Sequence, residues 1–255
     1  MLFDKNWLKQ FPTWKALSKA SNADVIHVWS GLGYNRRALA LRDIAKQVIE
    51  NGIPETREQW IELKGIGPYT SAAISLFSNG EKVFPVDSII RRFGGRYYFG
   101  RLFPTNKVDE RLEKKGLELL NQTDRYQDIP QALFDLGTKV CKKNPDCKKC
   151  PLKSSCKAAP TFLSGKVIIP KRSLPKAKEK VHAGKKFPDR IYRGRILGVV
   201  KQGGLIGAGK RVIIKLVDQS YTTKLDKEWF HAMLARLEKD ELIVNKKNKY
   251  YLKTD

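Results

Sequence analysis

All four cysteines of this 255-residue chain lie in one short segment, which restricts what that part of the chain can form. They are Cys141, Cys147, Cys150 and Cys156, separated by five, two and five residues. Cysteines clustered in this way in a cytosolic protein indicate a bound metal ion or metal cluster rather than a set of scattered disulfides. The spacing alone is compatible with zinc held by four thiolates and equally with an iron–sulfur cluster.

The charge of the chain indicates a polyanionic partner. Its formal net charge is +24 and its pI is about 9.9, and nucleic acid is the most common partner of so basic a protein. Hydrophobic residues make up 41% of the chain, as in an ordinary folded protein. No run approaches ~18 apolar residues and no apolar signal region follows Met1, so we expect no membrane association and a cytoplasmic location, at the nucleoid in a bacterium or archaeon.

The first part of the chain has the periodicity of short helices joined by tight turns, and it contains no convincing strand. The spacing of apolar residues and the glycine and proline stops predict helices over 24–29, 36–49, 56–63, 70–77, 86–98, 108–120 and 131–140. We therefore expect an all-α fold for this part.

Beyond the cysteines, the composition becomes strongly basic, and we expect an extended linker over residues 161–190. Regular secondary structure is predicted again from residue 191, with helical patterns over 191–200, 210–216 and 227–239 and strand patterns over 242–244 and 250–252. Three helices followed by a hairpin is the order of a winged helix, which often places its third helix in a DNA groove. Lys246, Lys247 and Lys249 in the hairpin turn favour DNA contact over a packing or protein-interaction module.

The segment Lys64-Gly65-Ile66-Gly67-Pro68-Tyr69-Thr70 forms a compact turn between two predicted helices. Two glycines allow a sharp turn that exposes backbone amides, and the helix that follows adds the positive end of its dipole. Such an end binds a phosphate without contacting bases. In so basic a chain, the turn indicates a DNA-phosphate hairpin, although a plain interhelical loop would have the same pattern.

Asp87 follows this turn at the start of a predicted helix. An aspartate in that position caps the helix, and a carboxylate facing a sugar can also stabilise the positive charge that develops as a base departs. The two roles can coexist. We expect the neighbouring Arg91 and Arg92 to contact phosphates or to belong to a solvated face.

Hairpin, aspartate and four-cysteine loop occur here in a specific order. Over residues 5–158 the chain resembles the helix-hairpin-helix glycosylase superfamily that includes endonuclease III and MutY. The segments HVWSGLGYNRRA from His27, LKGIGPYTSAAI from Leu63 and QALFDLGTKVC from Gln131 carry the resemblance, which in detail is to MutY-like adenine glycosylases. It implies a 4Fe-4S cluster rather than zinc on the four cysteines, with Asp87 as the catalytic aspartate.

The resemblance also implies a reaction. Endonuclease III-like members that cut the strand have a lysine where this chain has Tyr69, and a tyrosine cannot form their Schiff base. We therefore expect a monofunctional glycosylase that releases adenine opposite 8-oxoguanine or G. The alternatives are a thymine glycosylase acting on T·G mismatches and a DNA-binding member without activity. The family's catalytic glutamate lies in a segment that precedes the match to Met1, so we expect slower catalysis from these residues than from a chain extended upstream.

The expected architecture is mostly α. A helix-hairpin-helix glycosylase domain with its cluster loop spans residues 1–160, a basic linker spans 161–190, and a small α+β winged-helix-like domain spans 191–255. The expected partner is double-stranded DNA with a mismatch, bound by a monomer. The residues expected to contact it are Tyr34, Arg36, Lys64, Gly65, Ile66, Gly67, Tyr69 and Thr70, aided by the lysines of the cysteine loop.

Overall fold

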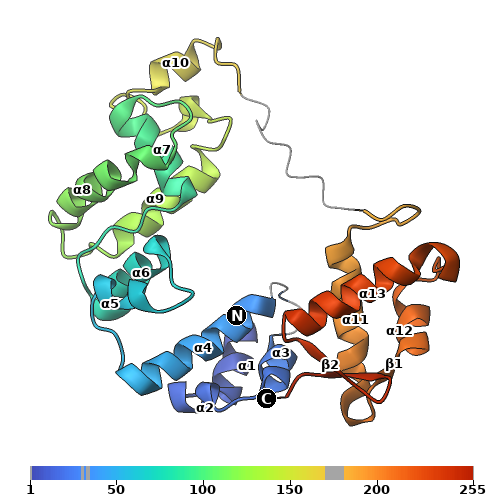
Figure 1. Cartoon of the computed structure of the whole chain (residues 1–255). Coiled ribbons are helices and arrows are strands. Elements are labelled where there is room, and N and C mark those ends of the chain that lie inside the picture. The colour runs from blue at the N-terminus through green and yellow to red at the C-terminus, as the bar shows by residue number, and fades with distance from the viewer. Residues whose placement is uncertain (1, 30–31, 33–34, 170–180, 255) are drawn as a thin grey trace. The chain divides into compact units, whose positions relative to one another are not determined.

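The computed structural model describes residues 2–29, 32, 35–169 and 181–254 of the chain. These residues form two compact units, one of which spans 53–169 while the other joins 2–52 to 181–254 (Figure 1). This grouping differs from the order of domains expected along the sequence, 1–160, 161–190 and 191–255, which stays a prediction. Among the described residues, no helix is both long and apolar enough to span a membrane.

The unit of residues 53–169 is built from helices, and its described residues contain no strand. Each predicted helix is confirmed here, with ends that differ by no more than three residues from the expected ones. The elements are α5 (Arg57–Glu62), α6 (Pro68–Ile74), the π-helical turn η1 (Ser75–Asn79), α7 (Ser88–Phe99), the 3₁₀ turn η2 (Asn106–Val108), α8 (Asp109–Leu120), α9 (Asp128–Lys139), the 3₁₀ turn η3 (Cys147–Lys149) and α10 (Ala159–Leu163).

Local chemistry fixes where these helices begin and how closely they pack. Thr56 and Gln59 form a capping box at the start of α5, in which each side chain accepts from the other residue's backbone N–H. In α8, a Cβ added to Gly116 would lie 1.9 Å from the Phe84 ring, so only glycine allows this approach. The core that forms around it contains Leu76, Phe84, Val86, Ile90, Val108, Leu112 and Leu120.

The second unit combines the first helices of the chain with its C-terminal elements. It contains α1 (Leu2–Gln10), α2 (Trp14–Ser18), α3 (Asn22–Val28), α4 (Asn35–Asn51), α11 (Asp189–Gly203), η4 (Gly204–Ile206), β1 (Ala208–Gly209), α12 (Lys210–Val217), α13 (Thr223–Lys239), β2 (Ile243–Lys246) and β3 (Lys249–Leu252). We call residues 181–254 the C-terminal module. Its predicted helices and hairpin strands are confirmed, whereas β1 was not expected.

The C-terminal module has a three-stranded antiparallel sheet with the order β1-β3-β2. Ala208 pairs with Tyr250, and Ile243 pairs with Leu252. The turn between β2 and β3 is two residues long, and both Lys247 and Asn248 take positive φ, at 49° and 64°. Positive φ at both central residues is the geometry of a type I′ turn, whose twist matches that of the strands.

One hydrophobic core joins the early helices to the C-terminal module. As predicted, α13 buries one face, made of Trp229, Phe230, Met233, Leu234 and Leu237. The same cluster of buried side chains contains Phe11, Leu17, Val25, Ile26, Ala38 and Ala45 from the amino-terminal helices. Polar contacts cross this junction too: the Asn22 side chain donates to the carbonyl of Glu241, and Lys201 donates to that of His27, at 3.4 and 3.1 Å.

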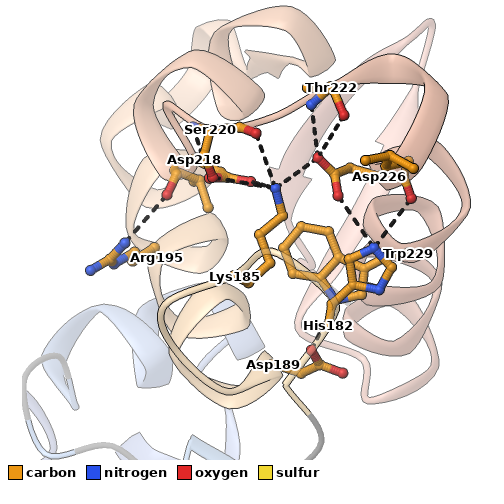
Figure 2. Close-up of polar contacts among 11 residues, drawn as sticks. His182, Lys185, Asp189, Arg195, Asp218, Ser220, Thr222, Asp226 and Trp229 are labelled. Carbon is orange, nitrogen blue, oxygen red and sulfur yellow. Dashed lines mark hydrogen bonds and ion pairs between the residues drawn. The ribbon is translucent and has the colours of Figure 1, made fainter.

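A buried ion cluster fixes the start of the C-terminal module (Figure 2). The Lys185 ammonium lies 2.7 Å from both the Asp218 and the Asp226 carboxylates, and all three side chains are at most 4% exposed. His182 stacks on Trp229 with 4.9 Å between ring centroids, and its Nε2 lies 3.2 Å from Asp226. We call Lys185, Asp218 and Asp226 the lysine anchor.

The lysine anchor corrects part of the linker prediction. Lys185 falls within the basic, extended linker expected over 161–190, but its side chain is buried and paired. Burial disfavours the charged form of Lys185, but its hydrogen bonds to Asp218 and Asp226 outweigh this and raise its pKa. The module therefore begins several residues before α11, and Lys185 belongs to its packed interior.

Candidate functional site

The turn between α5 and α6 has the geometry that its two glycines predicted. Gly65 takes a φ of 104°, a conformation that residues with a Cβ rarely adopt. Gly67 is the N-cap of α6 and makes no side-chain capping bond, and Pro68 occupies the first turn of the helix. Ile66 is only 8% exposed, and its N–H donates to the Leu63 carbonyl at 3.0 Å. The turn is therefore held from inside while its backbone faces outward.

The outer surface of this turn is open to solvent. Lys64, Tyr69 and Thr70 are all exposed, with Tyr69 at 46%. The first N–H groups of α6 have no intrahelical acceptor, as at every helix start. No acidic residue lies in the first turn of the helix. Exposed amides at a positive helix end are able to bind an anion such as a phosphate.

Asp87 combines both roles that the sequence left open. It is the N-cap of α7, and its Oδ1 accepts hydrogen bonds from the backbone N–H groups of Ile89 and Ile90 at 2.9 and 2.6 Å. Its second oxygen, Oδ2, has no hydrogen-bond partner among the described residues, and the side chain is half-buried. The cap thus fixes the carboxylate while leaving one oxygen available.

The structure brings the turn and Asp87 together. Burial raises the pKa of the Tyr69 hydroxyl, and the negative charge of Asp87 raises it further. Tyr69 stands in the first turn of α6 and Asp87 at the start of α7, so the two helix amino ends carry these side chains toward the same region. The tyrosine is therefore kept neutral beside the carboxylate.

The four cysteines surround one cavity. Cys141, Cys147, Cys150 and Cys156 all line it, together with side chains of α7 and α10. Burial raises the pKa of the Cys147 thiol, and the charges of the three neighbouring cysteines raise it further. No group of three or more histidine, cysteine or acidic side chains placed to hold a metal ion is found in the described part of the chain.

Arg96 holds the cysteine loop from within, a role that no pattern in the sequence indicated. It is 2% exposed, and its guanidinium donates to the carbonyls of Leu102, Lys142 and Lys143 at 2.9, 2.6 and 2.9 Å. Its Nη1 also lies 3.5 Å from the Cys141 Sγ. The guanidinium has no carboxylate partner among the described residues, so its positive charge stands beside the Cys141 sulfur. The donor set and this charge fit a ligand that takes up four thiolates.

The expectation for Arg91 and Arg92 was wrong. Arg91 forms a bidentate pair with Asp109 at 2.5 and 2.6 Å, which raises the pKa of the arginine. Arg92 donates to the carbonyls of Gly137 and Cys141 at 2.7 and 2.9 Å, and burial lowers its pKa. Both side chains lie between helices because α7 presents them to α8 and to the end of α9. They organise the fold instead of facing phosphates.

The other residues predicted to contact DNA are exposed on the cysteine loop, exposed in the second unit, or outside the described residues. The lysines of the cysteine loop are all exposed, at Lys142, Lys143, Lys148, Lys149 and Lys153. Arg36 is exposed in the first turn of α4, in the unit that does not contain the turn of residues 64–70. Tyr34 lies outside the described residues.

Comparison with known proteins finds similarity to base excision DNA repair proteins. Residues 3–120 match the family model of the HhH-GPD superfamily base excision DNA repair protein. An adenine DNA glycosylase of Buchnera aphidicola subsp. Baizongia pistaciae is 36% identical over 166 residues, which are 64% of this chain and 46% of that protein. One of Mycobacterium tuberculosis is 30% identical over 200 residues, 77% of this chain and 62% of that protein. The chain thus spans about half of the first relative and under two thirds of the second.

Solved structures agree on the fold. A thermostable thymine-DNA glycosylase superposes with a TM-score of 0.57 at 23% identity, covering 63% of this chain and 76% of that one. The region matched by the family model includes the turn of residues 64–70 and Asp87. It ends before the first cysteine and before the C-terminal module.

Proposed function

We propose that the chain is a monofunctional DNA glycosylase of the HhH-GPD superfamily of base excision DNA repair proteins, whose family model matches residues 3–120. It hydrolyses the N-glycosidic bond of adenine mispaired with 8-oxoguanine or G in duplex DNA. The observation that carries this proposal is the geometry of Asp87, a carboxylate fixed through one oxygen and open at the other.

Asp87 supplies a fixed negative charge in this mechanism. Loss of a base leaves positive charge on the sugar, and a carboxylate that is already oriented stabilises it without reorganising. The two backbone N–H bonds to Oδ1 provide that orientation, and Oδ2 faces the sugar. Water then adds at the anomeric carbon, so the products are free adenine and an abasic site. The target nucleotide must leave the helical stack for this contact to form.

Residues 64–70 hold the DNA backbone in the proposed complex. The amides of Gly65 and Gly67 and the first turn of α6 bind a phosphate, and Lys64 adds a positive charge. Tyr69 lies beside Asp87 and is neutral at physiological pH, since its pKa is raised. A neutral phenol cannot form a Schiff base with the sugar, which supports hydrolysis without strand cleavage.

The four cysteines are the ligands for a 4Fe-4S cluster in this proposal. A bound cluster supplies four iron–thiolate bonds that close the loop. Arg96 offsets negative charge at Cys141, and the exposed lysines of the loop contact DNA phosphates nearby. Cys141 to Cys156 therefore provide a DNA-binding surface and no reacting group.

The test is release of free adenine by the full chain from duplexes with A opposite 8-oxoguanine or G, followed by alkali to cleave the abasic sites. We expect strand breaks after alkali and none before it. A duplex with T opposite G tests the thymine alternative directly. Tight duplex binding with no base released from any mispair would contradict the proposed activity and support a DNA-binding role.

A further inference from the structure

Two large apolar side chains stand in solvent at one turn of the C-terminal module. Leu205 is 100% exposed and Ile206 is 76% exposed, and both belong to η4, the short turn between α11 and β1. Single exposed apolar side chains are ordinary on a protein surface. Two adjacent ones that contact mainly water are unfavourable, and a partner that covers them removes this cost. We call Leu205 and Ile206 the apolar tip.

The backbone of the apolar tip is held against the sheet. The Ile206 carbonyl accepts hydrogen bonds from the Lys249 ammonium at 3.2 Å and from the Tyr251 hydroxyl at 3.4 Å. Gly207 takes a φ of 72°, and a Cβ there would lie 2.5 Å from the Tyr251 ring, so only glycine fits. Its N–H donates to the Gly203 carbonyl at 3.1 Å. A turn fixed in this way loses little conformational entropy when it binds a partner.

The two segments of chain that carry and hold the apolar tip are basic and contain no acidic residue. Residues 201–217 and residues 242–254 each contain four lysines or arginines and neither aspartate nor glutamate. Of these basic residues, only Lys253 forms an ion pair with an acidic side chain among the described residues, at 3.0 Å from Glu241. The others are Lys201, Lys210, Arg211, Lys215, Lys246, Lys247 and Lys249. The apolar tip therefore lies within chain of one sign of charge.

This charge decides which partner fits the apolar tip. A second copy of the chain would bring the same basic segments against each other, and like charges repel. Duplex DNA instead offers phosphates to the basic side chains and a stack of bases to the apolar ones. Leucine and isoleucine are among the side chains that DNA-binding proteins insert between base steps. Duplex DNA is therefore the partner that satisfies both the charge and the apolar side chains.

We propose that the apolar tip is a wedge that inserts at a base step of duplex DNA, while basic residues of 201–217 and 242–254 bind phosphates beside it. Leu205 and Ile206 lose their contact with water on insertion, and this offsets the unstacking of that step. The choice of DNA over an acidic protein rests on the proposed function. In this assignment the C-terminal module contacts bases through η4, as a second site apart from residues 64–70.

The test compares two variants of the full chain that each truncate two exposed apolar side chains. L205A/I206A removes the apolar tip, whereas V212A/L216A removes side chains of α12 that are 53% and 60% exposed. Affinity is measured for a fully paired duplex between about 50 and 200 mM salt, the range over which phosphate contacts weaken measurably. We expect L205A/I206A to bind about tenfold more weakly because apolar burial is lost. Its slope of log K against log salt should not change, because no phosphate contact is lost. V212A/L216A should bind as the unmodified chain does.

A fluorescent base reports the insertion directly. 2-Aminopurine emits more strongly when it loses its stacking neighbours, and it is placed at successive positions of the same paired duplex. The unmodified chain and V212A/L216A should raise the emission at one step, and L205A/I206A should not raise it there. The same emission from all three proteins, together with equal affinities, would overturn the wedge and leave a protein as the partner of the apolar tip.

Two further measurements separate this inference from its alternatives. Sedimentation of the unmodified chain tests self-association, and a dimer that L205A/I206A converts to monomers would overturn the wedge in favour of a second copy. Base release from a mispaired duplex at saturation tests the proposed function, and L205A/I206A should retain it because Asp87 is unchanged. If the unmodified chain releases no base but L205A/I206A still binds DNA more weakly, the wedge stands and the glycosylase activity falls.

Discussion

Each of the two units contains a buried basic side chain, Arg96 in one and Lys185 in the other, and the surroundings of the two differ. Arg96 in the unit of residues 53–169 donates to three backbone carbonyls and lies next to a cysteine sulfur. Lys185 in the other unit lies between two carboxylates at 2.7 Å. Both basic side chains are almost fully shielded from solvent, so burial alone does not distinguish their roles.

The two sites differ in whether a positive charge remains at the buried side chain. Carbonyls satisfy the N–H groups of Arg96 but leave its positive charge in place for an anionic ligand, and the Cys141 sulfur lies beside that charge. Asp218 and Asp226 more than cancel the charge of Lys185, so the lysine anchor attracts no further anion. The first arrangement suits a bound ligand, whereas the second is a closed structural contact.

The largest effect is expected when the lysine anchor is broken. K185M leaves two buried carboxylates without their cation, which typically destabilises a fold by about 3–5 kcal/mol. Urea unfolding monitored by tryptophan fluorescence should show the loss. K186M is the matched control, because Lys186 is the exposed neighbour of Lys185. Equal stability of the two variants would mean that the lysine anchor contributes nothing.

A catalytic effect of similar size is expected in the other unit. D87N keeps an oxygen that caps α7 but removes the negative charge, so base release should fall by about 10²–10³-fold, as when a group that stabilises transition-state charge is lost. Single-turnover adenine release at saturating duplex measures it. The unfolding midpoint should stay near that of the unmodified chain. An unchanged rate would show that Asp87 is only a helix cap.

Asp87 shows which features the sequence can predict. Asp87 acts locally: its hydrogen bonds reach residues two and three positions away, so a cap was predictable from the pattern of its own helix. The hydrophobic face of α13 and the glycines at 65 and 67 follow from local rules in the same way. Such features account for nearly all helix positions and for the arrangement of the turn at residues 64–70.

Long-range pairing explains what was missed. Lys185 meets carboxylates 33 and 41 residues away, and within a basic stretch its charge resembles that of any solvated lysine. Arg96 meets carbonyls of the cysteine loop 46 and 47 residues away, and backbone acceptors leave no sequence signal. The strand β1 has two residues and is defined only by pairing with β3.

Removing Arg96 should weaken the cysteine loop more than the rest of its unit. R96M removes the donor to the carbonyls of Leu102, Lys142 and Lys143, and each lost hydrogen bond typically costs about 0.5–1.5 kcal/mol. We expect less iron and a weaker brown absorbance per protein after purification without air. R101M, at an exposed position nearby, is the control. Full iron loading of R96M would show that Arg96 does not support ligand binding by the cysteines and would make it a structural contact, as Lys185 is.

The pH dependence of the lysine anchor gives a smaller, graded effect. Burial opposes charge on Asp218 and Asp226, but bonds to Lys185 outweigh it and lower both pKa values, while the pKa of Lys185 is raised. The lowered carboxylate pKa values stabilise the fold above the ordinary value of 3.8, and this contribution is lost as the pH falls below it. The raised lysine pKa stabilises it below 10.5, and that contribution is lost as the pH rises further.

Between these limits the contribution of the anchor should therefore be constant. The measurement compares unfolding free energies of the unmodified chain and of K185M/D218N/D226N, in which none of the three groups titrates. Their difference should be flat from about pH 4 to about pH 10 and change outside that range, as expected for ordinary aspartate and lysine pKa values. A difference that changes steadily around neutral pH would show that other groups control the anchor, with His182 nearest to it.

The smallest effect concerns Lys247 in the turn between β2 and β3, where stability and DNA binding should change in opposite directions. Its φ of 49° is a conformation that glycine adopts freely and that costs a lysine about 1 kcal/mol. K247G should therefore raise the unfolding midpoint slightly, yet lower the salt slope of duplex binding if this turn contacts phosphate as its charge predicts. K246Q removes a neighbouring charge without releasing strain, so it should lower the slope alone. An unchanged slope in both variants would make the turn a purely structural connection.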